Sequence, residues 1–237
     1  MKGALDRSAA ILGDAAMARL AGAHVLVVGL GGVGGWCAEA LARTGVGRLT
    51  VVDDDAVEPS NMNRQCAATS GTIGMPKAEA MRERLVASSP SVEVSASSDR
   101  FSSWREGLGF DAVVDAIDSV DCKADLLLGA SAEGVPVFSS MGAALRTDPS
   151  AVRLTRFSKV EGDGLARALR HRFRKLGRWP AQDFACAWSA EPPARMEERG
   201  SLMQVTATFG MFLAAAVVRM LCGGNGAKSP QGGKSNG

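Results

Sequence analysis

The sequence predicts an α/β fold in which a doubly wound, mostly parallel sheet is followed by an irregular C-terminal extension and a closing helix. Three observations lead to this prediction. Short apolar runs alternate with helical patterns between His24 and Ser139, a glycine-rich turn follows the first run, and an aspartate follows the second. Such alternation is typical of parallel strands joined by crossover helices, so ligands are expected at the carboxyl ends of the strands.

The first elements follow from the residue pattern near the amino terminus. A short amphipathic helix is expected near 9–20, and residues 24–28 are apolar and mostly β-branched, which predicts a buried strand. A glycine-rich turn then leads into a helix over about 32–43, and a second strand is expected at 48–52. This order of strand, tight turn and helix is Rossmann-like.

The later elements follow a long polar connection, which occupies 54–75 and is of a kind that is usually functional. Pro76 suits the first turn of a helix that continues to about Ala87. Further elements are expected as strands near 92–96, 112–116 and 135–139 and a helix near 123–133. After Gly142 the pattern becomes irregular, and we expect an extra strand, a mobile segment around 160–199 and the closing helix.

Composition limits the classes of protein that remain. A chain of 237 residues with 46% hydrophobic content can form one domain over 1–222, and the glycine- and serine-rich residues 223–237 predict a flexible tail. The net charge of +2 gives no whole-protein attraction to nucleic acid or membrane. Five scattered cysteines without a CxxC pair indicate reduced thiols, a cytoplasmic location and no zinc site, and the acidic residues near the amino terminus argue against a secretory signal.

The apolar stretch 205–222 has two interpretations. It is as long as the shortest membrane spans, which begin at about 17 residues. Because it contains Thr206, Thr208, Gly210 and Arg219, a buried core or interface helix is the better interpretation, and an integral membrane protein is not expected.

The glycine-rich turn and the aspartate after the second strand predict a nucleotide site. Glycines permit a tight turn that presents backbone N–H groups and a helix amino terminus to phosphate. Asp53 follows Gly34 by 19 residues, where a carboxylate can bind ribose hydroxyls. A glycine-rich packing turn is the alternative. The glycines expected at the nucleotide are Gly29, Gly31, Gly32 and Gly34.

Four motifs, VVGLGGVGG, VVDDDAVEPSNMNRQ, IGMPKAEAM and DAIDS, occur in the order and spacing of the ThiF-type adenylating enzymes. The chain resembles this family over nearly its whole length. Ubiquitin-activating enzymes and the activators of sulfur-carrier proteins share the fold. The resemblance implies one ATP-binding adenylation domain over 1–222 that transfers AMP from ATP to a carboxylate.

The resemblance also implies roles for individual residues. Asp53 is expected to bind ribose, and Asp118 to hold Mg²⁺ on the phosphates of ATP. Arg7 matches an arginine that family dimers donate to the neighbouring subunit's ATP site, so a homodimer is expected. The residues expected at the phosphates and the adenylation transition state are Asn61, Arg64 and Lys77, and the nucleotide-binding set also includes Asp55 and Gln65.

Within the family, RTGVGRLTVVDDDAV, DAIDSVDCKADLL and VTATFG resemble the branch that dehydrates threonylcarbamoyladenosine in tRNA to its cyclic form. The implied reaction is ATP-dependent activation of the threonyl carboxylate as an acyl-adenylate, followed by intramolecular ring closure with release of AMP. Some members carry a cysteine shortly before VTATFG, whereas this chain reads ERGSLMQ. Cys186 is therefore interpreted as a structural thiol, and a sulfur-transfer partner is left open.

A tRNA substrate requires a surface that contacts phosphate, and LARALRHRFRKLGRW supplies a basic run. Arg167, Arg170 and Arg174 share a helical face, and Lys175 lies beside them. These four residues are expected to contact RNA, and the alternative is an ordinary solvated helix face.

Three other functions share the nucleotide fingerprint. A nicotinamide-dependent dehydrogenase is disfavoured because the chain has no tyrosine and neither His24 nor His171 is placed as a proton donor. An activator of a ubiquitin-like sulfur-carrier protein is disfavoured by the missing CxxC pairs. A nucleotide-binding scaffold without turnover is disfavoured by the presence of Arg64, Lys77 and Asp118.

Overall fold

The structure describes residues 3–101, 104, 107–196, 198 and 200–223. These residues contain seven strands, seven α-helices and three short 3-10 turns. The strands are β1 (His24–Val28), β2 (Arg48–Val52), β3 (Glu93–Ser97), β4 (Ala112–Asp115), β5 (Val137–Ser140), β6 (Val152–Arg156) and β7 (Ala185–Ser189). The helices are α1 (Asp6–Leu12), α2 (Asp14–Gly22), α3 (Gly34–Thr44), α4 (Lys77–Ser88), α5 (Val120–Ala132), α6 (Gly164–Leu176) and α7 (Met203–Leu221). The 3-10 turns are η1 (Pro59–Asn61), η2 (Pro149–Ala151) and η3 (Phe157–Lys159).

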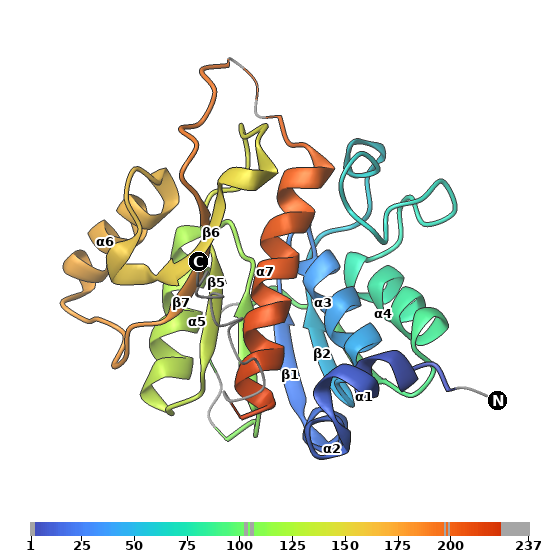
Figure 1. Cartoon of the computed structure of the whole chain (residues 1–237). Helices are drawn as coiled ribbons and strands as arrows, with labels where there is room; N and C mark the ends of the chain where they lie inside the picture. Colours follow the sequence, from blue (N-terminus) through green and yellow to red (C-terminus); the bar gives the residue numbers. More distant parts are fainter. Residues whose placement is uncertain (1–2, 102–103, 105–106, 197, 199, 224–237) are drawn as a thin grey trace, which may run out of the picture.

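One sheet separates two helical layers in the computed structural model (Figure 1). The strand order is β3-β2-β1-β4-β5-β7-β6, and all neighbours are parallel except β6 and β7. Helices α3, α4 and α7 contribute to the core on one face, and α5 and α6 to the core on the other. The predicted doubly wound, mostly parallel fold is confirmed.

The order of the strands places a crevice above β1 and β4. From β1 the chain proceeds through α3 and β2 toward one edge of the sheet, and from β4 it proceeds through α5 and β5 toward the other. The two strands nevertheless lie side by side, with Val28 opposite Asp115. Ligands in open α/β sheets bind at such a reversal, outside the carboxyl ends of the strands.

Two predicted segments differ from the structure. The expected helix over 9–20 is divided into α1 and α2 because Gly13 has a φ of 79°, which interrupts the helical backbone. The segment 160–199, expected to be mobile, contains α6 and β7 in its described part. Strand β7 pairs with β5 and β6, so this segment contributes an inner strand to the sheet.

Helix α7 packs on α3 and across the sheet, as expected for a core helix. A Cβ atom at Gly210 would lie 2.5 Å from the carbonyl oxygen of Val33, so the two helix backbones approach closely there. By length and composition alone, α7 is the one helix among the described residues that could cross a membrane. Within its apolar stretch of 18 residues, 44% is buried inside the protein. The predicted tail, 223–237, lies outside the described residues apart from Gly223.

Candidate nucleotide and adenylation site

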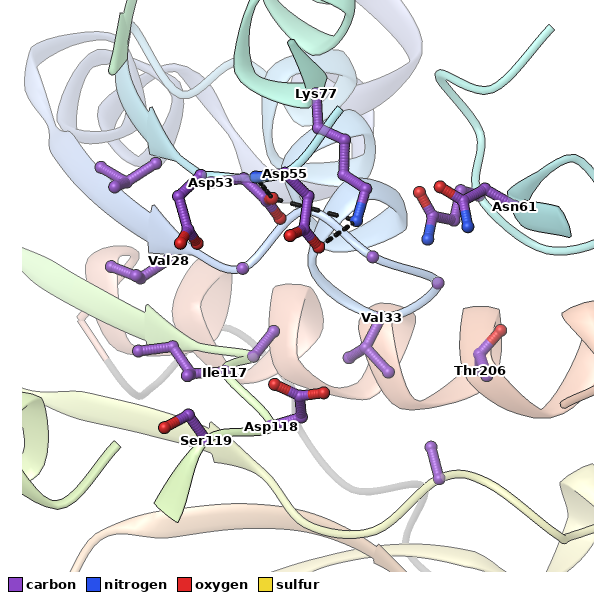
Figure 2. A pocket seen from close by; sticks show the side chains of 18 of the residues that line it. Val28, Val33, Asp53, Asp55, Asn61, Lys77, Ile117, Asp118, Ser119 and Thr206 are labelled. Carbon is purple, nitrogen blue, oxygen red and sulfur yellow. Dashed lines mark hydrogen bonds and ion pairs between the residues drawn. The ribbon is translucent and has the colours of Figure 1, made fainter. Parts of the chain in front are cut away.

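A cleft of about 640 Å³ opens at the carboxyl ends of β1, β2 and β4 (Figure 2). The lining comes from the glycine-rich turn, the end of β2 and the polar connection after it, the segment after β3, the loops after β4 and β5, and the first turns of α4, α5 and α7. Cofactor pockets typically have volumes of about 300–1,000 Å³. The cleft therefore has the size and the place in the fold expected of the predicted nucleotide site.

The glycines of the glycine-rich turn lie in two different surroundings. Gly29 has a φ of 87°, and a Cβ atom there would lie 2.6 Å from the carbonyl oxygen of Ala116. At Gly31, a Cβ atom would meet only Gln65 Nε2, at 3.9 Å, so this residue leaves space on the cleft side. The turn is thus packed against the β4 loop on one side and open to a ligand on the other.

Asp53 is fixed at the end of β2 by two backbone N–H groups. Leu30 N–H donates to Oδ2 at 2.6 Å, and Asp55 N–H donates to Oδ1 at 3.0 Å. Burial raises the pKa of Asp53, while these hydrogen bonds and the nearby Lys77 act in the opposite direction. A carboxylate offers about four lone-pair sites. Asp53 therefore keeps acceptor capacity for hydroxyl groups at the cleft, and its contact with ribose stays a prediction.

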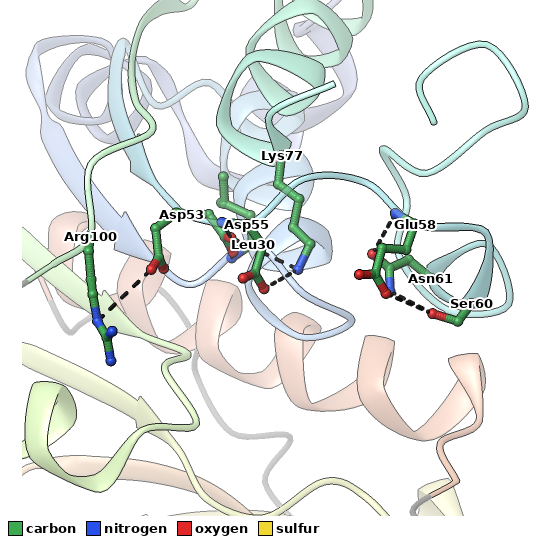
Figure 3. A network of polar contacts seen from close by, with 9 residues as sticks. Leu30, Asp53, Asp55, Glu58, Ser60, Asn61, Lys77 and Arg100 are labelled. Atoms are coloured by element: carbon green, nitrogen blue, oxygen red, sulfur yellow. Dashed lines mark hydrogen bonds and ion pairs between the residues drawn. The ribbon is translucent and has the colours of Figure 1, made fainter. Parts of the chain in front are cut away.

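Lys77, the first residue of α4, brings a positive charge to the aspartates (Figure 3). Its Nζ lies 2.6 Å from Asp55 Oδ2 and 4.0 Å from Asp53 Oδ1. The Lys77 N–H also donates to the Asp55 carbonyl, at 2.9 Å. These contacts fix the amine at the cleft, where an incoming phosphate would compete with Asp55 for it.

The polar connection after β2 positions Asn61 and Arg64. Asn61 ends η1, where Glu58 N–H donates to its Oδ1 at 3.2 Å. Arg64 Nη1 donates to the Ser60 carbonyl at 3.0 Å and to Asn63 Oδ1 at 2.8 Å. These local bonds hold an amide and a guanidinium at the cleft beside the buried Gln65, as the sequence predicts.

Asp118 lies across the cleft from Lys77, on the loop after β4 (Figure 2). The side chain is exposed, and no hydrogen bond or ion pair to its carboxylate occurs within the part of the chain that the structure describes. Mg²⁺ in nucleotide sites typically takes one or two carboxylates together with phosphate oxygens and water. The accessible carboxylate of Asp118, opposite Lys77 and the glycine turn, fits that requirement.

The sequence analysis missed several residues that line the cleft. Arg100 and Phe101 follow β3 and could have been found because the carboxyl ends of parallel strands share one edge of the sheet. Thr206 lies in VTATFG, and its Oγ1 would be 2.8 Å from a Cβ atom at Gly32. Only the fold brings α7 to the glycine turn, so no local signal identifies Thr206.

Two predicted residues lie away from the cleft. Arg7 is exposed on α1 and does not line the cleft of its own chain. Cys186 lies in β7 with no exposed surface, and burial raises the pKa of its thiol well above the ordinary value. This burial agrees with the interpretation of Cys186 as a structural thiol.

The basic face of α6 differs in one residue from the expectation. Arg167, Arg174 and Lys175 are exposed. Arg170 instead donates from Nη2 to the carbonyls of Phe157 and Val160, at 2.8 and 2.7 Å, and its guanidinium lies 4.8 Å from the Phe157 ring centre. Arg170 therefore ties α6 to η3, and RNA contact by the other three residues stays a prediction.

Comparisons with known proteins identify the family of the chain. The model of the ThiF family matches residues 5–233. The tRNA threonylcarbamoyladenosine dehydratase of Escherichia coli is 35% identical over an alignment of 245 residues. This alignment covers 90% of this chain and 91% of that protein. A crystal structure of that enzyme, TcdA, in complex with ATP has a TM-score of 0.86 at 34% identity and covers 92% of this chain and 93% of its own.

A more distant relative is the molybdopterin-synthase adenylyltransferase of Escherichia coli, 30% identical over 203 residues that cover 84% of this chain and 73% of that protein. The dehydratase thus matches more of this chain at higher identity. The family model and both relatives lead to the same conclusion. This chain belongs to the ThiF family.

Proposed function

We propose that this protein dehydrates N6-threonylcarbamoyladenosine in tRNA to its cyclic form, at the expense of ATP. The observation that carries the proposal is the placement of Lys77, Arg64 and Asp118 around the glycine turn in one cleft, in a chain 35% identical to a dehydratase of that name. The ATP complex of that enzyme supports ATP as the nucleotide.

ATP binding is assigned to the turn after β1 and the end of β2. The N–H groups of the glycine turn and the amino terminus of α3 face the phosphates, where a helix dipole favours negative charge. Asp53 accepts hydrogen bonds from the ribose hydroxyls, and the buried Gln65 adds a polar group beside Gly31. The nucleotide then extends along the cleft toward Lys77.

The first chemical step is attack of the threonyl carboxylate on the α-phosphorus, with departure of pyrophosphate. Negative charge increases on the transferring phosphoryl group, and preorganised cations and hydrogen-bond donors stabilise it. Lys77 and Arg64 supply positive charge, and Asn61 supplies a neutral donor. Asp118 would hold Mg²⁺, which neutralises phosphate charge when bound.

The second step closes the ring within the substrate. A group of the same threonylcarbamoyl side chain attacks the activated carbonyl carbon, and AMP leaves with the oxygen that the substrate loses. Because both partners belong to one molecule, proximity provides much of the rate, and no protein nucleophile is needed. The buried Cys186 is consistent with such a mechanism.

The remaining assignments concern the tRNA, the second subunit and the compartment. The exposed Arg167, Arg174 and Lys175 are assigned to phosphates of tRNA. Arg7 lies outside its own cleft, so a contribution to catalysis requires a second copy, which we propose as a homodimer. All five cysteines are free thiols, which fits a reducing cytoplasm and leaves a sulfur-transfer partner as a separate possibility.

The decisive experiment combines the purified protein with ATP, Mg²⁺ and tRNA that carries threonylcarbamoyladenosine, followed by mass spectrometry of the digested nucleosides. We expect loss of one water from that nucleoside, dependent on ATP and matched by AMP. The same tRNA without the modification is the control and should yield no AMP. An unchanged nucleoside would refute the proposal.

The same preparation tests the alternative acceptor. An adenylyltransferase for a ubiquitin-like carrier would form an adenylate at the carrier's C-terminal carboxylate and leave the tRNA nucleoside intact. AMP release with such a carrier, together with an unchanged tRNA, would identify this second function.

A further inference from the structure

A buried ion pair lies beneath the loop that carries Asp118. Lys123 Nζ is 2.8 Å from Asp115 Oδ2, and neither side chain has exposed surface. Ser139 Oγ donates to the same Oδ2 at 2.6 Å. None of these three residues lines the cleft. The pair joins β4, β5 and the first turn of α5 inside the core.

Stability alone does not account for this pair. Removing two charges from water is costly, and replacing a buried ion pair with well-packed apolar residues is often neutral or stabilising. The other residues of β4 are Ala112, Val113 and Val114, all buried, so an apolar residue would also suit position 115. The backbone groups that form hydrogen bonds with the pair indicate its role.

Both polar backbone groups of Ile117 are bonded to the pair. The Ile117 N–H donates to Asp115 Oδ1 at 3.1 Å, and the Ile117 carbonyl accepts from Lys123 Nζ at 2.9 Å. The next residue is Asp118. The residue before, Ala116, donates its N–H to the Val28 carbonyl at 2.8 Å. The loop is therefore fixed relative to the end of β1, where the glycine turn begins.

Asp118 depends on this backbone for its position, because its carboxylate makes no hydrogen bond or ion pair within the described residues. Resting on the function proposed above, we propose that Lys123 and Asp115 are positioning residues for adenylation, which clamp Ile117 and so hold Asp118 opposite the glycine turn. A displacement of about 1 Å at a reacting group can cost about 100-fold in rate.

The test is the double variant Asp115→Leu/Lys123→Met, which removes both charges and keeps side chains of similar bulk. The single variant Lys123→Met would leave a buried, unpaired carboxylate and unfold the protein for that reason alone. We expect the double variant to fold. Its kcat for AMP formation should fall by about 100-fold while KM for ATP changes little, because Lys77 and the glycine turn are untouched. Amide hydrogen exchange at Ile117 should accelerate.

Two further variants test whether kcat and Ile117 exchange follow the loss of bonds to Ile117. Asp115→Asn/Lys123→Met is also uncharged and keeps an acceptor for the Ile117 N–H, so it should lie between the wild type and the first double variant in both kcat and exchange. Ser139→Ala removes one hydrogen bond to Asp115 and neither bond to Ile117. It should retain the kcat and the Ile117 protection of the wild type.

The outcomes separate the clamp from the proposed function. A folded double variant with wild-type exchange at Ile117 overturns the clamp, and faster exchange with unchanged kcat overturns its role in positioning Asp118 for adenylation. If the Leu/Met variant does not fold, the Asn/Met variant decides by the same two measurements. If the wild type forms no AMP, the proposed function fails, while Ile117 exchange in the variants still decides whether the clamp exists.

Discussion

Lys77 and Asp55 form an ion pair at the edge of the cleft, and the two side chains differ in exposure. Nζ and Oδ2 are 2.6 Å apart, and the side chain of Lys77 is 10% exposed whereas that of Asp55 is 68% exposed. The amine is therefore held by its surroundings, and the carboxylate is the partner that a ligand can displace. A bound triphosphate would replace an exposed carboxylate with a group of greater negative charge. On the proposed function, we expect Lys77 to be a preformed phosphate contact.

Replacing Lys77 with glutamine should lower the rate of AMP formation by about 100-fold, because removal of one preorganised transition-state interaction typically costs that much. ATP binding should weaken less, since the glycine turn and Asp53 remain. The control is Arg82→Gln, which removes an exposed cation on the same helix outside the cleft. Equal AMP formation by the two variants in a single-turnover assay would show that Lys77 plays no catalytic part.

Replacing Asp118 with asparagine should abolish Mg²⁺-dependent AMP formation and leave the thermal unfolding midpoint unchanged. The side chain is exposed and has no bonded partner in the described part of the chain, so its replacement breaks no structural interaction. Calorimetric titration should show that ATP binding without Mg²⁺ persists. Asp121→Asn, on the first turn of α5, is the matched control. Wild-type AMP release by Asp118→Asn would refute the magnesium role.

The sequence predicted the elements that local patterns determine. β1 and β2 have the bounds expected, because each is a short run rich in β-branched residues and ended by glycine or aspartate. The residues from Asp53 to Lys77 that line the cleft could be predicted because the motifs place them in order, and their binding of nucleotide stays a prediction. Their clustering in one cleft follows from the parallel sheet.

What the sequence could not supply comes from interactions between distant segments. β7 has no β-branched residue, and its strand conformation arises from pairing with β5 and β6. The basic face of α6 was recognised, but the bonds from Arg170 to Phe157 and Val160 were not. Likewise, α5 begins at Val120 rather than near 123, which places Lys123 in the first turn and within reach of Asp115.

Charge reversal on α6 should weaken tRNA binding. The triple variant Arg167→Glu/Arg174→Glu/Lys175→Glu should also flatten the dependence of log Kd on log salt, by on the order of 1 for each side chain that no longer neutralises a phosphate. AMP formation at saturating tRNA should persist, because α6 lies outside the cleft. Reversal of three cations outside α6 and outside the cleft, Arg82, Arg195 and Arg219, serves as the control for net charge. An unchanged salt slope in the triple variant would show that these three side chains of α6 do not contact phosphates of tRNA.

His24 should make the fold sensitive to mild acid. Its Nε2 lies 2.9 Å from Thr50 Oγ1, and its ring packs edge-on against Phe110 with centroids 4.7 Å apart. Burial, followed by the positive charge of Arg48, lowers the pKa of His24 below its ordinary value of 6.5. The unfolded chain therefore binds the proton more tightly than the folded chain does. The free energy of unfolding contributed by His24 is fully present above about pH 6.5 and decreases as the pH falls below it.

The variant His24→Gln should consequently lose less stability than the wild type when the pH falls from about 7.5 to about 5.5, as measured by thermal unfolding at each pH. Carboxylates titrate in both proteins, so the difference between their pH profiles isolates the histidine. The only other histidine, His171, is exposed on α6, and His171→Gln is the control that should follow the wild-type profile. Parallel profiles for wild type and His24→Gln would show that protonation of His24 is not linked to folding.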